Sequence, residues 1–106
     1  MIKTYNKLVR DKIPSIIERN NGNADYTILS DDEYIVELDK KLNEEIAEYQ
    51  ESKSIDEIAD ILEVLYAICK ARGFSEQELM DVKLKKAKKN GAFLNKIFLK
   101  TVEQSE

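Results

Sequence analysis

The sequence predicts an all-α protein, and three observations carry this prediction. Three serines are each followed, three residues on, by a glutamate, which is the capping-box pattern of helix starts: Ser30 with Glu33, Ser54 with Glu57, and Ser75 with Glu78. Apolar residues then recur every three or four positions, the spacing of one helix face. The 3 glycines and 1 proline are too few for the turns of an all-β sandwich or barrel. We expect a helical bundle that dimerisation completes, with short extended segments at both ends.

The first third of the chain is predicted to be only partly regular. Residues 1–13 are basic and irregular, and Pro14 favours the first turn of a short helix over residues 15–20. Asn and Gly residues at 20–23 indicate a turn, and the run at 26–29 is prone to form a β-strand. This part of the chain therefore links an irregular start to the longer helices.

The rest of the chain is predicted to be mostly helical. Three longer helices follow, one after each capping box, over residues 31–51, 55–72 and 76–90. The last two end at Gly73 and Gly91, because glycine readily takes the left-handed conformation that follows a helix. The apolar tail at 92–99 is expected either as a strand paired with residues 26–29 or as an extended arm on the bundle.

Composition excludes several kinds of site. The chain of 106 residues forms one domain, 1–106, and its single cysteine, Cys69, excludes an internal disulfide. There is no histidine, which removes Ser-His-Asp and Cys-His chemistry. A metal site must then use oxygen ligands, which favours Mg²⁺, Mn²⁺ or Ca²⁺.

Charge and hydropathy indicate where the protein works. The net charge of −4 does not favour nucleic acid as a partner. No apolar run approaches the roughly 18 residues of a membrane span, and the start of the chain lacks the apolar core of a signal peptide. We expect a cytoplasmic protein with no membrane association.

The helix predicted over residues 31–51 has a carboxylate inside its apolar stripe. At 3.6 residues per turn, the stripe is formed by Ile35, Leu38, Leu42, Ile46 and Tyr49. Glu45 falls within it, Glu48 on its edge and Glu44 outside it. A carboxylate in an apolar stripe is costly unless it is paired or bound to a cation.

The helix predicted over residues 55–72 is apolar nearly all round, which is typical of a bundle centre or a subunit interface. One of its rows holds Ile61, Val64 and Ile68, and we expect these residues or their neighbours at a homo-oligomer interface, in a dimer or a tetramer. Glu57 and Asp60 lie beside this row at i, i+3 spacing.

A short connection makes the two helices antiparallel, so four carboxylates meet at one end of the hairpin: Glu45, Glu48, Glu57 and Asp60. They would repel one another unless a counter-charge, such as a divalent cation, lay between them.

Simpler interpretations remain open for each of these acids. Glu57 is also the N3 residue of a capping box and would then bond to the Ser54 amide instead. Glu45 could pair with a lysine across a helix interface, and Glu48 and Asp60 could be ordinary solvated charges.

Two basic groups could hold a polyphosphate beside such a site. The lysine run of the last helix, which includes Lys85, Lys88 and Lys89, is otherwise a solvated face. The second group, at the start of the chain, is Lys7, Arg10 and Lys12. Arg10 could equally pair locally with Asp11.

Several stretches resemble the all-α nucleotide pyrophosphohydrolases, a superfamily that includes MazG-like proteins. Residues 41–48 and 57–64 are similar to its E-E-x-x-E … E-x-x-D signature. The opening Y-N-K-L-V-R-D-K-I-P at 5–14 and the K-N-G-A-F at 89–93 resemble a subgroup called phosphoribosyl-ATP pyrophosphohydrolase-like. Ala92 departs from the Gly-Gly-Phe usual there, and only eight residues separate Glu48 from Glu57.

The resemblance implies a helical bundle completed by dimerisation and a Mg²⁺-dependent hydrolase, with Mn²⁺ as a substitute. This enzyme would cleave a nucleoside triphosphate or related nucleotide between the α and β phosphates, releasing a monophosphate and pyrophosphate. It also implies that Glu44 holds or deprotonates the attacking water and that the metal ligands are Glu45, Glu48, Glu57 and Asp60. The alternative is a non-catalytic nucleotide- or metal-binding module of the same fold.

Overall fold

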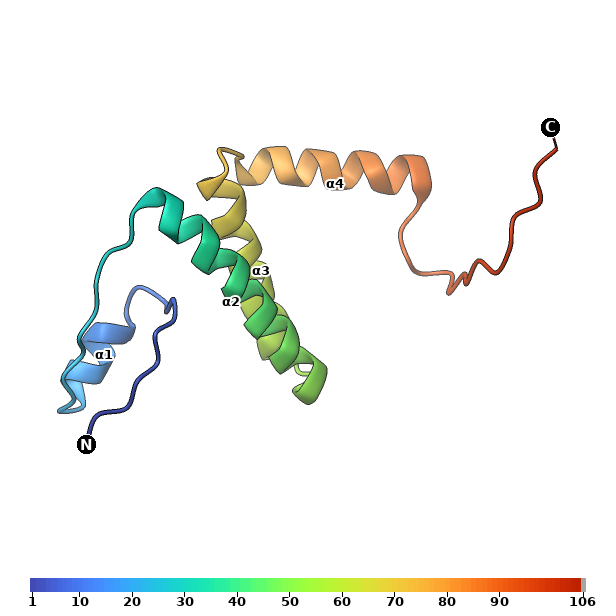
Figure 1. Ribbon diagram of the computed structural model, residues 1–106. Coiled ribbons are helices and arrows are strands. Elements are labelled where there is room, and N and C mark those ends of the chain that lie inside the picture. The colour runs from blue at the N-terminus through green and yellow to red at the C-terminus, as the bar shows by residue number, and fades with distance from the viewer. Residues whose placement is uncertain (106) are drawn as a thin grey trace. The chain divides into compact units, whose positions relative to one another are not determined.

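The computed structural model describes residues 1–105, and they form four helices: α1 (Ile13–Arg19), α2 (Asp31–Ser52), α3 (Ile55–Ala71) and α4 (Glu76–Asn90) (Figure 1). No strand occurs among these residues. The all-α prediction is therefore confirmed. The contacts within the chain separate it into a first unit, Met1–Glu76, and a second unit that begins at Gln77.

The strand expected at residues 26–29 is absent, and of the two alternatives for the tail the paired strand is wrong. Residues 26–29 belong to the irregular link between α1 and α2, and the tail after Gly91 has no regular secondary structure through residue 105. A β-prone run needs a second strand to satisfy its backbone groups, and within the described residues neither segment has one.

The start of α2 shows why this helix begins where the sequence predicts. The Ser30 hydroxyl accepts a hydrogen bond from the Glu33 amide at 3.3 Å, and the Glu33 carboxylate accepts one from the Ser30 amide at 3.2 Å. This reciprocal pair satisfies two backbone donors that the first turn leaves open. The capping box predicted here is confirmed.

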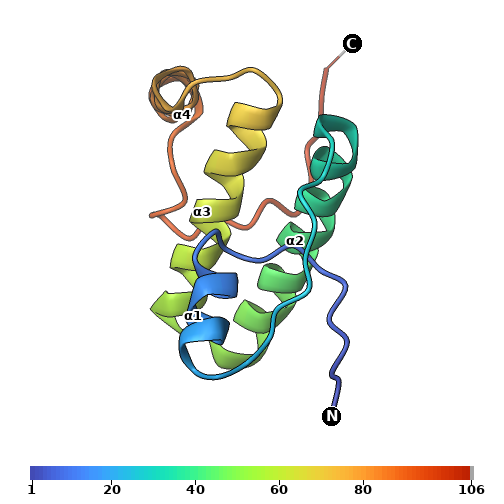
Figure 2. The ribbon, with the colours of Figure 1, turned by 90° about the vertical axis from the view of Figure 1, so that its left-hand side faces the viewer.

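The centre of the first unit is an antiparallel hairpin of α2 and α3, which lie side by side in Figure 2. Lys53, with a φ of 54°, ends α2 and donates from its amide to the Tyr49 carbonyl at 2.8 Å. Leu38 and Val64 are the buried apolar residues of the described chain. The hairpin therefore has a very small core of its own.

Backbone hydrogen bonds hold the segments on both sides of α1 to that helix. The Ile13 amide donates to the Arg10 carbonyl at 3.1 Å, which joins the irregular N-terminal segment to the first turn of α1. After α1, the Gly22 amide donates to the Ile17 carbonyl at 2.9 Å. A Cβ at Gly22 would lie 2.6 Å from the Ile17 side chain, so this close return of the chain requires glycine.

The second unit consists of α4 and the tail. Gly91, with a φ of 85°, ends the helix and donates from its amide to the Ala87 carbonyl at 2.8 Å, as predicted for a C-terminal glycine. Among the described residues, no helix is both long and apolar enough to cross a membrane.

Candidate metal centre

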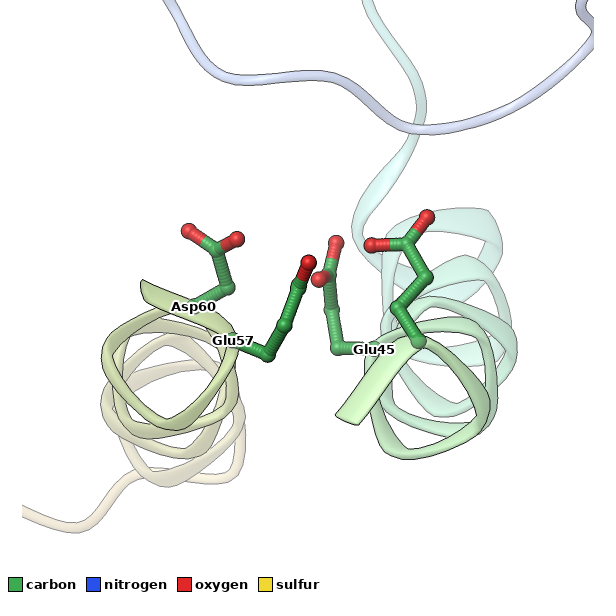
Figure 3. A group of neighbouring side chains, drawn as sticks. Glu45, Glu57 and Asp60 are labelled. Carbon is green, nitrogen blue, oxygen red and sulfur yellow. The ribbon is translucent and has the colours of Figure 1, made fainter. Parts of the chain in front are cut away.

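Four carboxylates from two helices converge at the connected end of the hairpin. Each offers one oxygen, and these oxygens all lie within 4.8 Å of one another: Glu45 and Glu48 of α2, and Glu57 and Asp60 of α3. We call this group the acidic cluster. Figure 3 shows Glu45, Glu57 and Asp60 extending from the two helices toward the same side. The i, i+3 spacing within each helix and the antiparallel pairing bring them together.

Glu45 is the member of the acidic cluster whose environment is least suited to a bare carboxylate. The residue is only 6% exposed, and its Oε2 has no hydrogen-bond partner among the described residues. Burial, together with the neighbouring Glu48, raises the pKa of its carboxyl group. Buried polar atoms in folded proteins are nearly always partnered. A cation bound to this oxygen would offset the free-energy cost of burying it without a partner.

Glu57 does not form the helix cap that its sequence position suggested. The Ser54 side chain accepts no capping hydrogen bond from the described residues of α3, and its hydroxyl lies 3.2 Å from that of Ser52. The capping box predicted at Ser54 is therefore wrong. The Glu57 Oε2 is buried and unpartnered within the described chain, like that of Glu45. Two buried oxygens without partners, one from each helix, fit an oxygen-ligated divalent cation.

Lysines surround the α2 side of the acidic cluster. Lys7 donates to Glu44 Oε1 at 2.6 Å and Lys41 donates to Glu44 Oε2 at 2.9 Å. These two hydrogen bonds lower the pKa of the Glu44 carboxyl. Lys41 also lies 3.4 Å from Glu45 Oε1. The sequence left open that Glu45 pairs with a lysine of another helix. Its lysine partner is instead Lys41, four residues earlier on the same helix, and this i, i+4 spacing is visible in the sequence.

Arg10 covers the α3 side. Its Nη2 donates to Asp60 Oδ1 at 2.7 Å, and its Nη1 lies 3.6 Å from Glu63 Oε1. The local pair with Asp11 considered from the sequence is replaced by these contacts with α3. Nothing in the spacing of the sequence indicated that Arg10 meets a residue 50 positions away.

The remaining candidate phosphate-binding residues lie on other parts of the chain. Lys12 precedes the first turn of α1 and is exposed. The other three lie on one face of α4, in the second unit, and their role stays a prediction: Lys85, Lys88 and Lys89. A pocket of about 200 Å³ lies between the N-terminal segment and α2, and its basic lining residues are Lys7, Lys40 and Lys41. Sequence reasoning had not assigned Lys40 or Lys41 to any site.

Comparison with known proteins adds little about this site. A protein of Mycolicibacterium smegmatis, described only as uncharacterized, is 44% identical over 50 residues. That stretch is 47% of this chain and 51% of that protein, so the match spans about half of each. No family model and no solved structure matches the chain.

Proposed function

We propose that the protein is a Mg²⁺-dependent nucleotide pyrophosphohydrolase that cleaves a nucleoside triphosphate or related nucleotide between the α and β phosphates. The observation that carries this proposal is the acidic cluster, and above all the buried, unpartnered oxygens of Glu45 and Glu57. The sequence resemblance to the all-α nucleotide pyrophosphohydrolases supplies the reaction. Mn²⁺ would serve in place of Mg²⁺, because both prefer carboxylate oxygens.

The four residues of the acidic cluster would hold the cation. When bound, Mg²⁺ supplies Lewis acidity at the phosphoryl oxygens and lowers the pKa of water. Glu45 is buried and Glu57 half-buried, and each has one oxygen shielded from solvent, whereas Glu48 is exposed. Lys7, Lys41 and Arg10 stand next to the cluster and would neutralise the phosphates and the leaving pyrophosphate.

Glu44 would orient the attacking water or accept its proton. Both of its oxygens accept from lysines, and its pKa is lowered, so it holds its negative charge firmly at neutral pH. Each of its oxygens has a second lone pair that could accept a hydrogen bond from water, and the side chain is 28% exposed. Lys7 is the lysine that belongs to the irregular N-terminal segment, and Lys41 is fixed on α2 itself.

The test is Mg²⁺-dependent release of pyrophosphate from a panel of nucleoside triphosphates and related nucleotides. We expect release by the wild type and none by a Glu45→Gln/Asp60→Asn double variant. Circular dichroism of the variant checks that its helices are intact. Absence of pyrophosphate release across the panel would contradict the proposed reaction.

The second candidate is a non-catalytic metal- and nucleotide-binding module, and the pairing of Glu44 with two lysines favours it, because the lowered pKa makes Glu44 a weaker base. Calorimetry distinguishes the two. A module binds Mg²⁺ and nucleotide without releasing pyrophosphate, whereas an enzyme does both.

A further inference from the structure

The N-terminal segment connects the two helices of the hairpin through a pair of cations. Lys7 reaches Glu44 on α2 and Arg10 reaches Asp60 on α3, at 2.6 and 2.7 Å. Figure 3 shows this segment, in pale blue, crossing on the side toward which the carboxylates extend. The segment therefore bridges the two helices on the side toward which the carboxylates extend.

The two cations differ in what they contact. The partner of Lys7 lies outside the acidic cluster, whereas the partner of Arg10 is a member of it. A guanidinium and a divalent cation on the same carboxylate repel each other strongly at such short range. A cation in the cluster therefore competes with Arg10 for Asp60 and leaves the contact of Lys7 in place.

Arg10 can exchange one carboxylate partner for another while its backbone stays in place. Its backbone is tied to α1 by the hydrogen bond from Ile13, while its side chain is largely exposed. Its second nitrogen already lies 3.6 Å from Glu63, one turn beyond Asp60 and outside the acidic cluster. If Asp60 bound a cation, Glu63 would still hold the Arg10 guanidinium beside the acidic cluster.

We propose that Arg10 is an exchangeable counter-ion, which neutralises Asp60 until a divalent cation displaces it and which then binds the polyphosphate of the nucleotide. This inference rests on the proposed function, since it requires the cluster to hold a cation. The planar guanidinium suits both roles, because its donors match the oxygens of a carboxylate and of a phosphate equally well. The cation and the polyphosphate thus bind in that order.

The exchange predicts that one substitution raises the affinity for Mg²⁺ and lowers the affinity for pyrophosphate. In Arg10→Gln the cation no longer has to break an exposed ion pair, so the affinity for Mg²⁺ rises about two- to fivefold. The same variant lacks a charge-assisted hydrogen bond to phosphate, so the affinity for pyrophosphate at saturating Mg²⁺ falls at least about tenfold. A residue that merely holds the segment in place would weaken both.

The experiment is isothermal titration calorimetry on the full chain, first with Mg²⁺ alone and then with inorganic pyrophosphate at saturating Mg²⁺. Arg19→Gln on α1 is the matched control, with the same change at an exposed arginine, and it should leave both affinities unchanged. Lys7→Gln removes a charge next to the cluster without freeing a ligand, so its gain in Mg²⁺ affinity should be smaller than that of Arg10→Gln. Arg10→Lys keeps the charge without the planar group and should lose pyrophosphate affinity with little change for Mg²⁺.

Three results would overturn the exchange. Equal gains in Arg10→Gln and Lys7→Gln would show an effect of charge through space alone. Unchanged or weaker Mg²⁺ binding by Arg10→Gln, with normal binding by the wild type, would remove this inference and leave the metal site standing. No Mg²⁺ binding by the wild type would remove both.

Discussion

Glu44 and Glu45 are adjacent in the sequence, yet their carboxyl groups occupy opposite environments. Glu44 accepts from two lysines, and its pKa is lowered; Glu45 is buried beside Glu48, and its pKa is raised. Neighbouring carboxyls whose pKa values are driven apart commonly divide roles at a site. Here Glu45 is suited to bind a cation and Glu44 to remain charged beside it.

The division of roles predicts different losses in two variants. Glu45→Gln should lose both metal affinity and turnover, because it removes the charge of the most buried residue of the acidic cluster. Glu44→Gln should keep metal affinity and lose about 10²–10⁴-fold in turnover, the range for a missing general base. Calorimetric Mg²⁺ titration, run beside a pyrophosphate-release assay, measures both quantities. Full activity of Glu44→Gln would move the base to Glu48, Glu57 or Glu63.

The residues of the acidic cluster were predictable because helix spacing alone puts them on facing sides of the hairpin. What spacing could not decide was the use of Glu57, since the same S-x-x-E pattern suits both a cap and a ligand. The contact of Arg10 with Asp60 was not predictable either. It depends on the path of an irregular segment, which has no periodicity to interpret.

At the scale of elements, the two caps that look alike in sequence should differ in stability. Ser30 closes a complete capping box at α2, whereas Ser54 accepts no capping bond from the described part of α3. Ser30→Ala should lower the free energy of unfolding by about 1 kcal/mol, and Ser54→Ala by much less. Urea denaturation of both variants measures this, with each serving as the control for the other. Equal losses would contradict the difference in capping.

The same box carries a dependence on pH. Hydrogen bonds from Ser30 lower the pKa of Glu33 below its ordinary value of 4.5. The contribution of the charged Glu33 carboxylate to stability is therefore complete when the pH is above 4.5. This contribution is lost as the pH falls through the lowered pKa. The cost of Ser30→Ala should shrink over this acidic range. A cost that stays constant there would show that the Glu33 carboxylate takes no part.

The helix ends agree with the sequence more closely than the other segments do. α3 ends at Ala71 with Gly73 at a φ of 86°, and α2 ends one residue beyond the predicted bound. Caps and glycines act within a few residues, so the local sequence determines them. The predicted strands depended on a distant partner, and no local pattern supplies one.

At the scale of the molecule, the hairpin buries too little apolar surface to account for the sequence of α3. The row expected at an interface is used within the chain, because Val64 is buried and Ile61 and Ile68 are half-buried. A neighbouring row remains open instead, formed by Ile58, Leu62 and Leu65. The sequence showed that α3 is apolar on two sides, but it could not show which side α2 would cover.

The open row predicts a homo-oligomer, a dimer or a tetramer, with α3 at the interface. Leu62 is 43% exposed in the single chain, and glutamate at this position would place an unpaired charge in the interface. Leu62→Glu should therefore give a monomeric mass by multi-angle light scattering, at concentrations where the wild type is associated. Val36→Glu is the control, because Val36 is 53% exposed on the face of α2 opposite Leu38, and it should leave the mass unchanged. A monomeric wild type would contradict the prediction, and an associated Leu62→Glu would move the interface to another face.

Because the hairpin lacks a substantial core, association through α3 should also make the melting temperature rise with protein concentration. This rise should be absent in Leu62→Glu.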